Sequence, residues 1–538
     1  MYIFILVYLI YIFYKSRTSL YMLQQNLYNE NNRFIRWIGR NNERCFNSID
    51  FLPFLLSIFI FLSRESFIME VVFLSIVLIY SKGIYDEYKK NLSNQNKIKF
   101  NVTSRIKRLY LTEFIIISIL LFMLVFTNFS GIYLVLLCLT ITFTYYFIYL
   151  VNIINKPIEK LVYMFYFNKA KNKLKDLSRL KVIGVTGSYG KTSSKNILSH
   201  ILSTKYITRP TPKNLNTPYG LMITINNYLD KFDEVLVAEM GAYVNGEIKN
   251  MCDFVKPKYG ILTTIGEAHL ETFKTRENIC RAKFELIESL DEHGACVLNL
   301  DDPYQVAYVK NELKNQVKII WIGVDNKESD FNAINIKTDK YGMNFDILYK
   351  EEKYHVETKL LGVHNIYNIL ASIALGVELK VDIHDMINKV KSILPVEHRL
   401  EIKKVNNITM IDDAYNSNPV GASNALDVLK MMDGVKVVVT PGMIELGSEE
   451  EKLNYEFGEK IGRIADYVIL IGENRCQDIK KGILSTGFEE DKIIILNKVV
   501  DAYTELEKIK SKTDREVYAL FENDLPDIYS EGGNKNEN

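Results

Sequence analysis

The sequence has no marked excess of charge of either sign, since 66 Lys and Arg residues stand against 65 Asp and Glu residues. Proteins that bind nucleic acid favour a basic face, so this balance gives no indication of a nucleic-acid partner. None of the six cysteines has a second cysteine at C-x-x-C spacing, which argues against a structural zinc site and against a disulfide framework. We therefore expect reduced thiols at Cys45, Cys138, Cys252, Cys280, Cys296 and Cys476.

The amino-terminal segment also lacks the marks of a cleaved secretory signal. Met1–Tyr14 is almost entirely apolar, but it has neither the leading basic region nor the small-residue cleavage site of a signal peptide. We expect this segment to form a first helix that is retained.

Long apolar runs crowd into the first third of the chain. A spanning helix needs roughly 20 apolar residues. Ile132–Ile153 reaches this length, and Phe114–Thr127 reaches it with its flanks. Phe51–Leu62 and Phe67–Tyr80 are shorter and flank a polar break, which indicates a hairpin of two helices. With the first helix, these runs predict an all-α transmembrane domain of about five spans over residues 1–155.

Basic residues between the apolar runs fall in two segments, 15–49 and 82–110. Basic loops stay on the cytoplasmic side, so an odd number of spans places everything after Lys156 in the cytoplasm. The sequence thus predicts a multi-pass protein of the cytoplasmic membrane with cytoplasmic catalytic domains. Residues 156–180 are basic and amphipathic, and they form either a helix against anionic headgroups or a solvated linker helix.

A phosphate-binding loop follows the apolar strand expected at Val182–Thr186 and precedes a helical pattern. In this order of elements, backbone N–H groups and the helix dipole face bound phosphates. Lys191 would reach the β- and γ-phosphates, and Thr192 would hold Mg²⁺ through its hydroxyl. The first glycine of the common pattern is replaced by Val185. The nucleotide-binding residues expected here are Gly187, Ser188, Gly190, Lys191, Thr192 and Ser193.

Two further polar residues follow apolar strands. Glu239 ends the strand expected at Val235–Glu239, and a carboxylate at a strand end facing a phosphate loop suits a metal ion. His269 lies shortly after the strand expected at Gly260–Thr264. Both are candidate metal ligands.

Seven short motifs follow one another along the soluble part: Thr186–Thr192, Glu239–Gly241, Glu267–Glu271, Ala282–Glu285, His364–Asn368, His398–Glu401 and Asp412–Pro419. Together they resemble the Mur ligase family, whose members are ATP-dependent enzymes that add amino acids to peptidoglycan precursors. Within the family the chain is most similar to the D-alanyl-D-alanine-adding branch. That likeness rests on Asn245–Ile248, Asp413–Asn416, Asn418-Pro419, Pro441–Met443 and Glu445–Gly447.

The resemblance implies a catalytic set for matching residues of this chain. Lys191 and Thr192 would hold the nucleotide phosphates and a first Mg²⁺, with Glu239 and His269 as further metal ligands. Lys283 matches a lysine that the family carries in carbamoylated form, and the carbamate would help to bind a second Mg²⁺.

The same resemblance implies nucleotide contacts further along the chain. Asn365 and Asn368 are spaced for one helix face and would contact the adenine. Arg399 and Asp413 would contact the nucleotide from the hinge and the last domain, with Asp413 on the ribose. A guanidinium such as that of Arg399 can fork onto phosphate oxygens.

The implied reaction is ADP-forming amide synthesis through an acyl phosphate, because a carboxylate has a poor leaving group until it is phosphorylated. Closure of the last domain over the nucleotide would exclude water. The expected cofactors are ATP and Mg²⁺. The expected partners are a carboxylate acceptor, an amine donor and membrane lipids.

The chain departs from the family at its amino-terminal end. Conventional members carry a domain there that binds the nucleotide-sugar carrier, and residues 1–180 leave no room for it. The acceptor is therefore either a UDP-linked muramoyl peptide bound by other surfaces or a lipid-linked precursor reached from the membrane.

The expected fold is α/β, with a P-loop domain over 181–395 and a Rossmann-like domain over 396–525. The expected strands begin at Val182, Val235, Gly260, Ala295 and Lys318 in the first domain, and near Thr409, Lys436, Tyr467 and Lys492 in the second. Residues 526–538 are expected to form a disordered tail.

Two other functions remain open from the sequence. A related membrane ligase could make a poly-amino-acid or another envelope amide. A membrane P-loop ATPase or kinase that regulates polysaccharide export belongs to another class, and it would leave the adenine and hinge motifs without a role.

Overall fold

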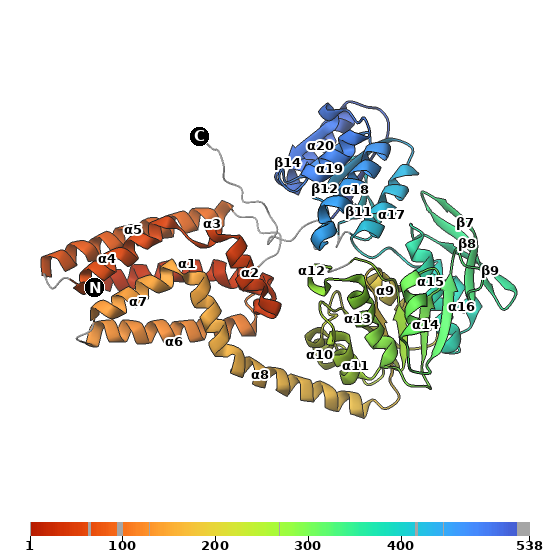
Figure 1. Ribbon diagram of the computed structural model, residues 1–538, viewed down its shortest axis with the longest axis horizontal. Helices are drawn as coiled ribbons and strands as arrows, with labels where there is room; N and C mark the ends of the chain where they lie inside the picture. The colour runs from red at the N-terminus through yellow and green to blue at the C-terminus, as the bar shows by residue number, and fades with distance from the viewer. Residues whose placement is uncertain are drawn as a thin grey trace. The chain divides into compact units, whose positions relative to one another are not determined.

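The computed structural model describes residues 2–62, 66–93, 100–127, 130–267, 270–414, 418–444 and 446–523. The chain divides into two compact units, Met1–Phe165 and Tyr166–Leu525 (Figure 1). His269, Tyr415–Ser417, Glu445 and the predicted tail at 526–538 lie outside the described residues.

The first unit is helical, as the apolar runs predict. A buried core of aromatic and aliphatic side chains, including Tyr8, Tyr80 and Ile148, holds its helices together. A buried ion pair between Lys15 and Asp50 lies among them. The helices are α1 (Tyr2–Gln25), η1 (Leu27–Asn32), α2 (Arg33–Arg40), α3 (Asn42–Cys45), η2 (Ser48–Asp50), α4 (Phe51–Leu62), α5 (Ser66–Ser93), α6 (Ser104–Phe126), α7 (Ser130–Thr142) and α8 (Thr144–Asp176).

Fewer helices are suited to cross a membrane than the five spans predicted. Among the described residues, α1 and α6 are long and apolar enough, and the bent pair α7–α8 adds a third if it counts as one span. Ser48–Phe59 is apolar but shorter. By length and composition the unit therefore offers two or three candidate spans.

The run Ile132–Ile153 does not form the single straight span predicted from its apolar length. It is split between α7 and α8, whose axes meet at 99°. At the bend the Ile141 carbonyl accepts hydrogen bonds from Lys15 Nζ (2.9 Å) and Thr144 Oγ1 (2.7 Å). Side chains that hydrogen-bond to helix carbonyls favour a kink. The Lys15 side chain comes from α1, far away in the sequence.

The helix α8 continues through the residues predicted to form a separate linker helix after 155. It is one helix from Thr144 to Asp176 and contains Pro157. Its last part belongs to the second unit, where Lys173 Nζ donates to the Leu229 carbonyl at 2.6 Å.

The second unit begins with a nine-stranded sheet in the order β2-β3-β1-β4-β5-β6-β7-β8-β9. The strands from β2 to β7 pair in parallel, which is typical of the α/β class predicted for this domain. Their bounds are β1 (Lys181–Thr186), β2 (Thr208–Pro210), β3 (Val235–Glu239), β4 (Tyr259–Leu262), β5 (Ala295–Asn299), β6 (Lys318–Gly323) and β7 (Phe331–Asp339). The strand β4 ends two residues before the predicted Thr264.

An antiparallel extension completes this sheet, and it was not predicted from the sequence. β7 pairs with β8 (Gly342–Tyr349), which pairs with β9 (Glu352–Thr358). Figure 1 shows these three green strands together at one end of the domain. The helices of the domain are α9 (Lys191–Leu202), α10 (Pro218–Asn227), α11 (Glu247–Val255), α12 (Leu270–Phe273), α13 (Arg276–Glu288), α14 (Pro303–Asn311), α15 (His364–Glu378) and α16 (Ile383–Val390).

A six-stranded sheet forms the last domain, in the order β10-β11-β15-β12-β13-β14. All neighbours pair in parallel except β10 and β11, which agrees with the Rossmann-like prediction. The strands are β10 (Glu401–Val405), β11 (Ile408–Asp413), β12 (Val435–Thr440), β13 (Tyr467–Ile471), β14 (Ile493–Leu496) and β15 (Val517–Glu522). The helices are α17 (Pro419–Lys430), α18 (Glu450–Ile464), α19 (Gln477–Ser485) and α20 (Val499–Ser511), with short turns η3 (Gly447–Glu449) and η4 (Glu490–Lys492).

Candidate active site

The loop between β1 and α9 has the conformation that a phosphate site requires. Gly190 has a φ of 77° directly before α9, a left-handed backbone that favours glycine. A Cβ at Gly187, where φ is 147°, would come within 2.0 Å of Thr263 Oγ1. The loop is held from the neighbouring strand, because Ser188 N donates to the Thr264 carbonyl at 2.7 Å. Both glycines are therefore needed to bring the backbone to the start of α9.

Lys191 is folded back over this loop. Its Nζ donates to the carbonyls of Gly187 (2.7 Å) and Ser188 (2.9 Å). Burial lowers the pKa of Lys191 to about 8, with a further lowering by the charge of Arg399. Thr192 and Ser193 follow in the first turn of α9, so the predicted phosphate-binding residues lie together in the loop and this turn.

Glu239, at the end of β3, lies at the centre of a buried polar cluster. Its Oε1 accepts from Thr192 Oγ1 at 3.1 Å and from Asn216 Nδ2 at 3.0 Å. Its Oε2 forms an ion pair with Lys195 Nζ at 3.0 Å, and both side chains are at most 2 % exposed. Lys195 also donates to the Lys213 carbonyl at 2.8 Å. A carboxylate and a hydroxyl side by side are the oxygen ligands that Mg²⁺ prefers.

Lys283 is buried in α13, with 2 % of its side chain exposed. Its Nζ lies 3.5 Å from the Ala242 carbonyl and 5.5 Å from the centre of the Phe273 ring. Burial and the nearby charge of Lys191 lower the pKa of Lys283 to about 7. Its amine is therefore neutral to a much greater extent near pH 7 than that of an ordinary lysine.

The segment after β4 is fixed by Asp302, which caps α14. Asp302 Oδ2 accepts from Ile265 N at 2.8 Å, while its Oδ1 accepts from Tyr304 N at 3.0 Å. Gly266 N donates to Ser188 Oγ at 3.0 Å, which ties this segment to the phosphate loop. His269 follows outside the described residues, so its role as a metal ligand stays a prediction.

Asn365 and Asn368 lie on one face of α15, as their spacing predicts, and both are buried. Asn368 Nδ2 donates to Asn365 Oδ1 at 3.2 Å, and Asn365 Nδ2 donates to the Leu361 carbonyl at 2.8 Å. A Cβ at Gly190 would lie 3.3 Å from Asn368 Oδ1. This pair is thus directly beside the phosphate loop.

Arg399 and Asp413 meet at the start of the last domain. Leu400 N donates to Asp413 Oδ1 at 3.2 Å. His398 and Leu400, on either side of Arg399, have left-handed φ values of 60° and 48°. Such values are uncommon outside glycine and cluster at functional sites. Burial raises the pKa of Asp413 to about 6, although the charge of Arg399 opposes this effect.

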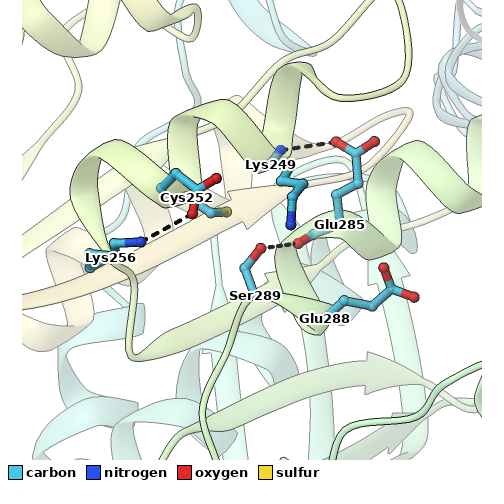
Figure 2. Close-up of a pocket in the computed structure, with 7 residues that line it drawn as sticks. Lys249, Cys252, Lys256, Glu285, Glu288 and Ser289 are labelled. Atoms are coloured by element: carbon cyan, nitrogen blue, oxygen red, sulfur yellow. Dashed lines mark hydrogen bonds and ion pairs between the residues drawn. The ribbon is translucent and has the colours of Figure 1, made fainter.

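Glu285 has a structural role at the other side of α13. Its carboxylate accepts from Gly246 N at 2.5 Å and from Lys249 N at 2.9 Å, and Figure 2 shows it turned toward the first turn of α11. The cleft beside it has a volume of about 130 Å³, and none of the predicted site residues lines it. Glu285 therefore fixes α13 against α11 and so positions Lys283.

Three polar residues of the site were not predicted from the sequence. Lys195 lies one helical turn after Lys191, and that spacing could have drawn attention to it. Asn216 and Asp302 act through long-range contacts with Glu239 and Ile265, for which the sequence holds no local signal. Within the described ranges, no cluster of three or more His, Cys, Asp or Glu side chains could hold a metal ion.

Two domain models match this second unit. The Mur ligase middle domain matches residues 185–376, and the Mur ligase, glutamate ligase domain matches residues 398–515, which together make up more than half of the chain. The chain belongs to the Mur ligase family. The two matches fall on the nine-stranded and six-stranded domains of this Mur ligase, with Arg399 at the start of the second.

Relatives of this Mur ligase include the UDP-N-acetylmuramoyl-tripeptide–D-alanyl-D-alanine ligase of Bacillus subtilis strain 168, which is 31% identical over 306 residues. That match covers 55% of this chain and 65% of the relative, so the chain spans less than two thirds of its length. The match to the Escherichia coli K12 ligase of the same name, at 30% identity, covers 52% of this chain and 61% of the relative.

A solved structure supports the assignment of the chain to the Mur ligase family. MurF ligase from Thermotoga maritima in complex with ADP has a TM-score of 0.58 and is 27% identical. The likeness covers 68% of this Mur ligase and 80% of that chain. The Mur ligase fold predicted from the motifs is therefore confirmed.

Proposed function

We propose that this chain is an ATP-dependent, ADP-forming ligase that joins a carboxylate to an amine. The observation that carries the proposal is the position of Glu239. Its carboxylate is 3.1 Å from Thr192 Oγ1 in the phosphate loop, in a chain whose two α/β domains are those of Mur ligases. This arrangement supports transfer of the γ-phosphoryl group of ATP.

Residues of this site fit a Mg²⁺ ion. Thr192 and Glu239 offer oxygen ligands 3.1 Å apart, and the buried Glu239 Oε2 is paired with Lys195 Nζ at 3.0 Å. His269 would add a further ligand, and a carbamate on Lys283 would help to bind a second Mg²⁺. When bound, the ion would neutralise charge on the phosphates.

A carbamate at Lys283 follows from the chemistry of its amine. The lowered pKa, about 7, leaves much of the amine neutral near pH 7, and a neutral amine adds to carbon dioxide with loss of one proton. The product is a carboxylate at the end of a long side chain. It replaces a buried cation near Lys191 with an anion, which removes their repulsion.

The reaction then proceeds in two displacements. An oxygen of the acceptor carboxylate attacks the γ-phosphorus, the bond to the bridging oxygen breaks, and ADP leaves with formation of an acyl phosphate. The amine attacks the acyl carbon, loses a proton, and expels inorganic phosphate. Lys191 and the backbone N–H groups of the loop stabilise the negative charge that develops on the phosphoryl oxygens.

Contacts with the rest of the nucleotide come from both domains. Asn365 and Asn368 contact the adenine, Arg399 binds phosphate oxygens, and Asp413 binds the ribose. Because Arg399 and Asp413 lie at the hinge and in the last domain, nucleotide binding favours closure of that domain. Closure excludes water, which would otherwise hydrolyse the acyl phosphate.

The substrates we propose are a muramoyl-peptide precursor and D-alanyl-D-alanine or a similar amino acid or dipeptide. The support is the activity for which the B. subtilis and E. coli relatives are named. A first unit of helices with two or three candidate spans favours a place at the cytoplasmic membrane, with the ligase domains in the cytoplasm. It also makes a lipid-linked acceptor a candidate beside a UDP-linked one. A poly-amino-acid or other envelope amide remains the second candidate product.

Release of ADP tests the proposal when acceptors and amines are supplied separately and together. We expect release only with ATP, Mg²⁺, one carboxylate acceptor and one amine, with the amide detected by mass. Lys191→Ala should abolish release and serves as the blank. The ligase proposal would be contradicted if the parent protein released ADP at a rate that no acceptor increases while Lys191→Ala released none. That result would favour an ATPase.

A further inference from the structure

One face of α8 carries large apolar side chains that are exposed. Leu150, Ile154, Ile158 and Leu161 are exposed by 51%, 48%, 47% and 67%. Their spacings of four, four and three residues place them on one side of a helix. Single exposed apolar residues are common on protein surfaces, but an aligned row of them indicates a surface that contacts a membrane or another protein.

The opposite side of α8 faces its own helical unit. Ile148, Val151 and Asn155 are buried. Glu159 accepts two hydrogen bonds from Arg108, both of 2.7 Å, at the start of α6. These contacts fix the rotation of α8, so the row from Leu150 to Leu161 points away from the unit.

Positive charge accompanies this part of α8. Lys156 and Lys160 on α8 and Lys107 on α6 are exposed, while the one acidic residue among them, Glu159, is neutralised by Arg108. Cationic side chains beside an apolar row are typical of helices that lie in the headgroup region of anionic membranes.

The helix α8 is also joined to a helix suited to cross a membrane. Arg108 joins α8 to the first turns of α6, a candidate span. Further along α6, Leu111, Phe114 and Ile115 are exposed by 58%, 61% and 48%. In a bilayer these side chains would face lipid, with the basic first turn of α6 at the headgroups.

We propose that the face of α8 formed by Leu150, Ile154, Ile158 and Leu161 is an interfacial docking surface for a bilayer that contains anionic lipid. Its apolar row enters the boundary between headgroups and acyl chains, and Lys156 and Lys160 bind the headgroups. This inference rests on the membrane location in the proposed function, and it is independent of the ligase reaction. Of the two alternatives for the basic segment after Lys156, this inference favours a helix against anionic headgroups over a solvated linker helix.

Site-specific labelling of the full-length protein tests the surface. All six native cysteines are buried, so Leu161→Cys or Ile158→Cys introduces one accessible thiol for an environment-sensitive fluorophore. The protein is reconstituted in vesicles of phosphatidylcholine, with or without phosphatidylglycerol. We expect blue-shifted emission and quenching by lipid-borne quenchers, both stronger with phosphatidylglycerol.

Matched variants show whether charge and position cause the effect. A label at Asn172→Cys, exposed near the end of α8, should report water in both vesicles. Replacing Lys156 and Lys160 by Glu in the Leu161→Cys variant should remove the added effect of phosphatidylglycerol. ADP release by each labelled variant reports separately on the ligase.

Two results would overturn the inference. One is water-like emission at position 161, with quenching by iodide, in both kinds of vesicle, which is the behaviour of a solvated linker. The other is protection of the label that persists in detergent and rises with protein concentration, which means that a second copy covers the face.

Discussion

Replacement of Lys195 by Met would test how the buried charge of Glu239 is balanced. The two side chains form an ion pair at 3.0 Å and are at most 2 % exposed. Methionine keeps the length of the side chain but leaves the carboxylate without its cation. Removal of one partner of a buried pair costs about 3 kcal/mol or more, which corresponds to a Tm lowered by roughly 6 °C.

The same substitution should strengthen metal binding. Without Lys195 the carboxylate of Glu239 loses the cation that is paired with it, so Mg²⁺ gains more by binding there. We expect Mg²⁺ with ADP to raise the Tm of Lys195→Met by more than it raises that of the parent protein. We also expect the Mg²⁺ concentration for half-maximal nucleotide binding to fall about tenfold, which is 1.4 kcal/mol.

Thermal unfolding and fluorescent-nucleotide binding, each with graded Mg²⁺, measure both effects. Lys195→Arg keeps the charge and should resemble the parent protein. Thr192→Val removes the hydroxyl 3.1 Å from Glu239 and should weaken Mg²⁺ binding, which is the opposite sign. If Lys195→Met and Thr192→Val weaken Mg²⁺ binding alike, or if Lys195→Met leaves the Tm unchanged, the reasoning is wrong.

Three further results are expected. Lys283→Met should lose most turnover, and added bicarbonate should not restore it. In the parent protein, bicarbonate should restore the activity that is lost in buffer free of carbon dioxide. Because protonation blocks carbamate formation and the pKa of Lys283 is about 7, the bicarbonate needed at pH 6 should exceed that at pH 8. Arg399→Lys keeps the charge but not the planar fork, and should raise the KM for ATP about tenfold, which is 1.4 kcal/mol.

Each of these results has an outcome that contradicts it. Bicarbonate dependence that survives in Lys283→Met would place the carbamate elsewhere. A bicarbonate requirement that does not change between pH 6 and pH 8 would remove the role of the lowered pKa. An unchanged KM for ATP in Arg399→Lys, with stability also unchanged, would exclude a bidentate phosphate contact.

Strands that are short, apolar and buried on both faces could be predicted from the sequence. β3 has the predicted bounds and β13 begins at the predicted Tyr467, because a parallel strand inside an α/β domain is a continuous apolar run. β2, with three residues, is too short to give such a run. β7 begins with three buried residues and then alternates half-buried and exposed positions, which is a weaker signal than a continuous run.

Local motifs likewise identified the phosphate loop, Glu239 and the asparagine pair of α15. The contacts of Lys195 and Asn216 with Glu239 could not be predicted, because they join residues that are 44 and 23 positions apart in the sequence. The bend between α7 and α8 has a similar origin. It involves Lys15, 126 positions before Ile141, and no property of the apolar run itself indicates it.

The path of one oxygen atom tests the central claim most directly. The acceptor that supports ADP release is prepared with oxygen-18 in its carboxylate and incubated with ATP and the amine. Formation of an acyl phosphate predicts one labelled oxygen in inorganic phosphate and the other in the amide. Unlabelled phosphate released together with the amide product would contradict attack of the carboxylate on the γ-phosphorus.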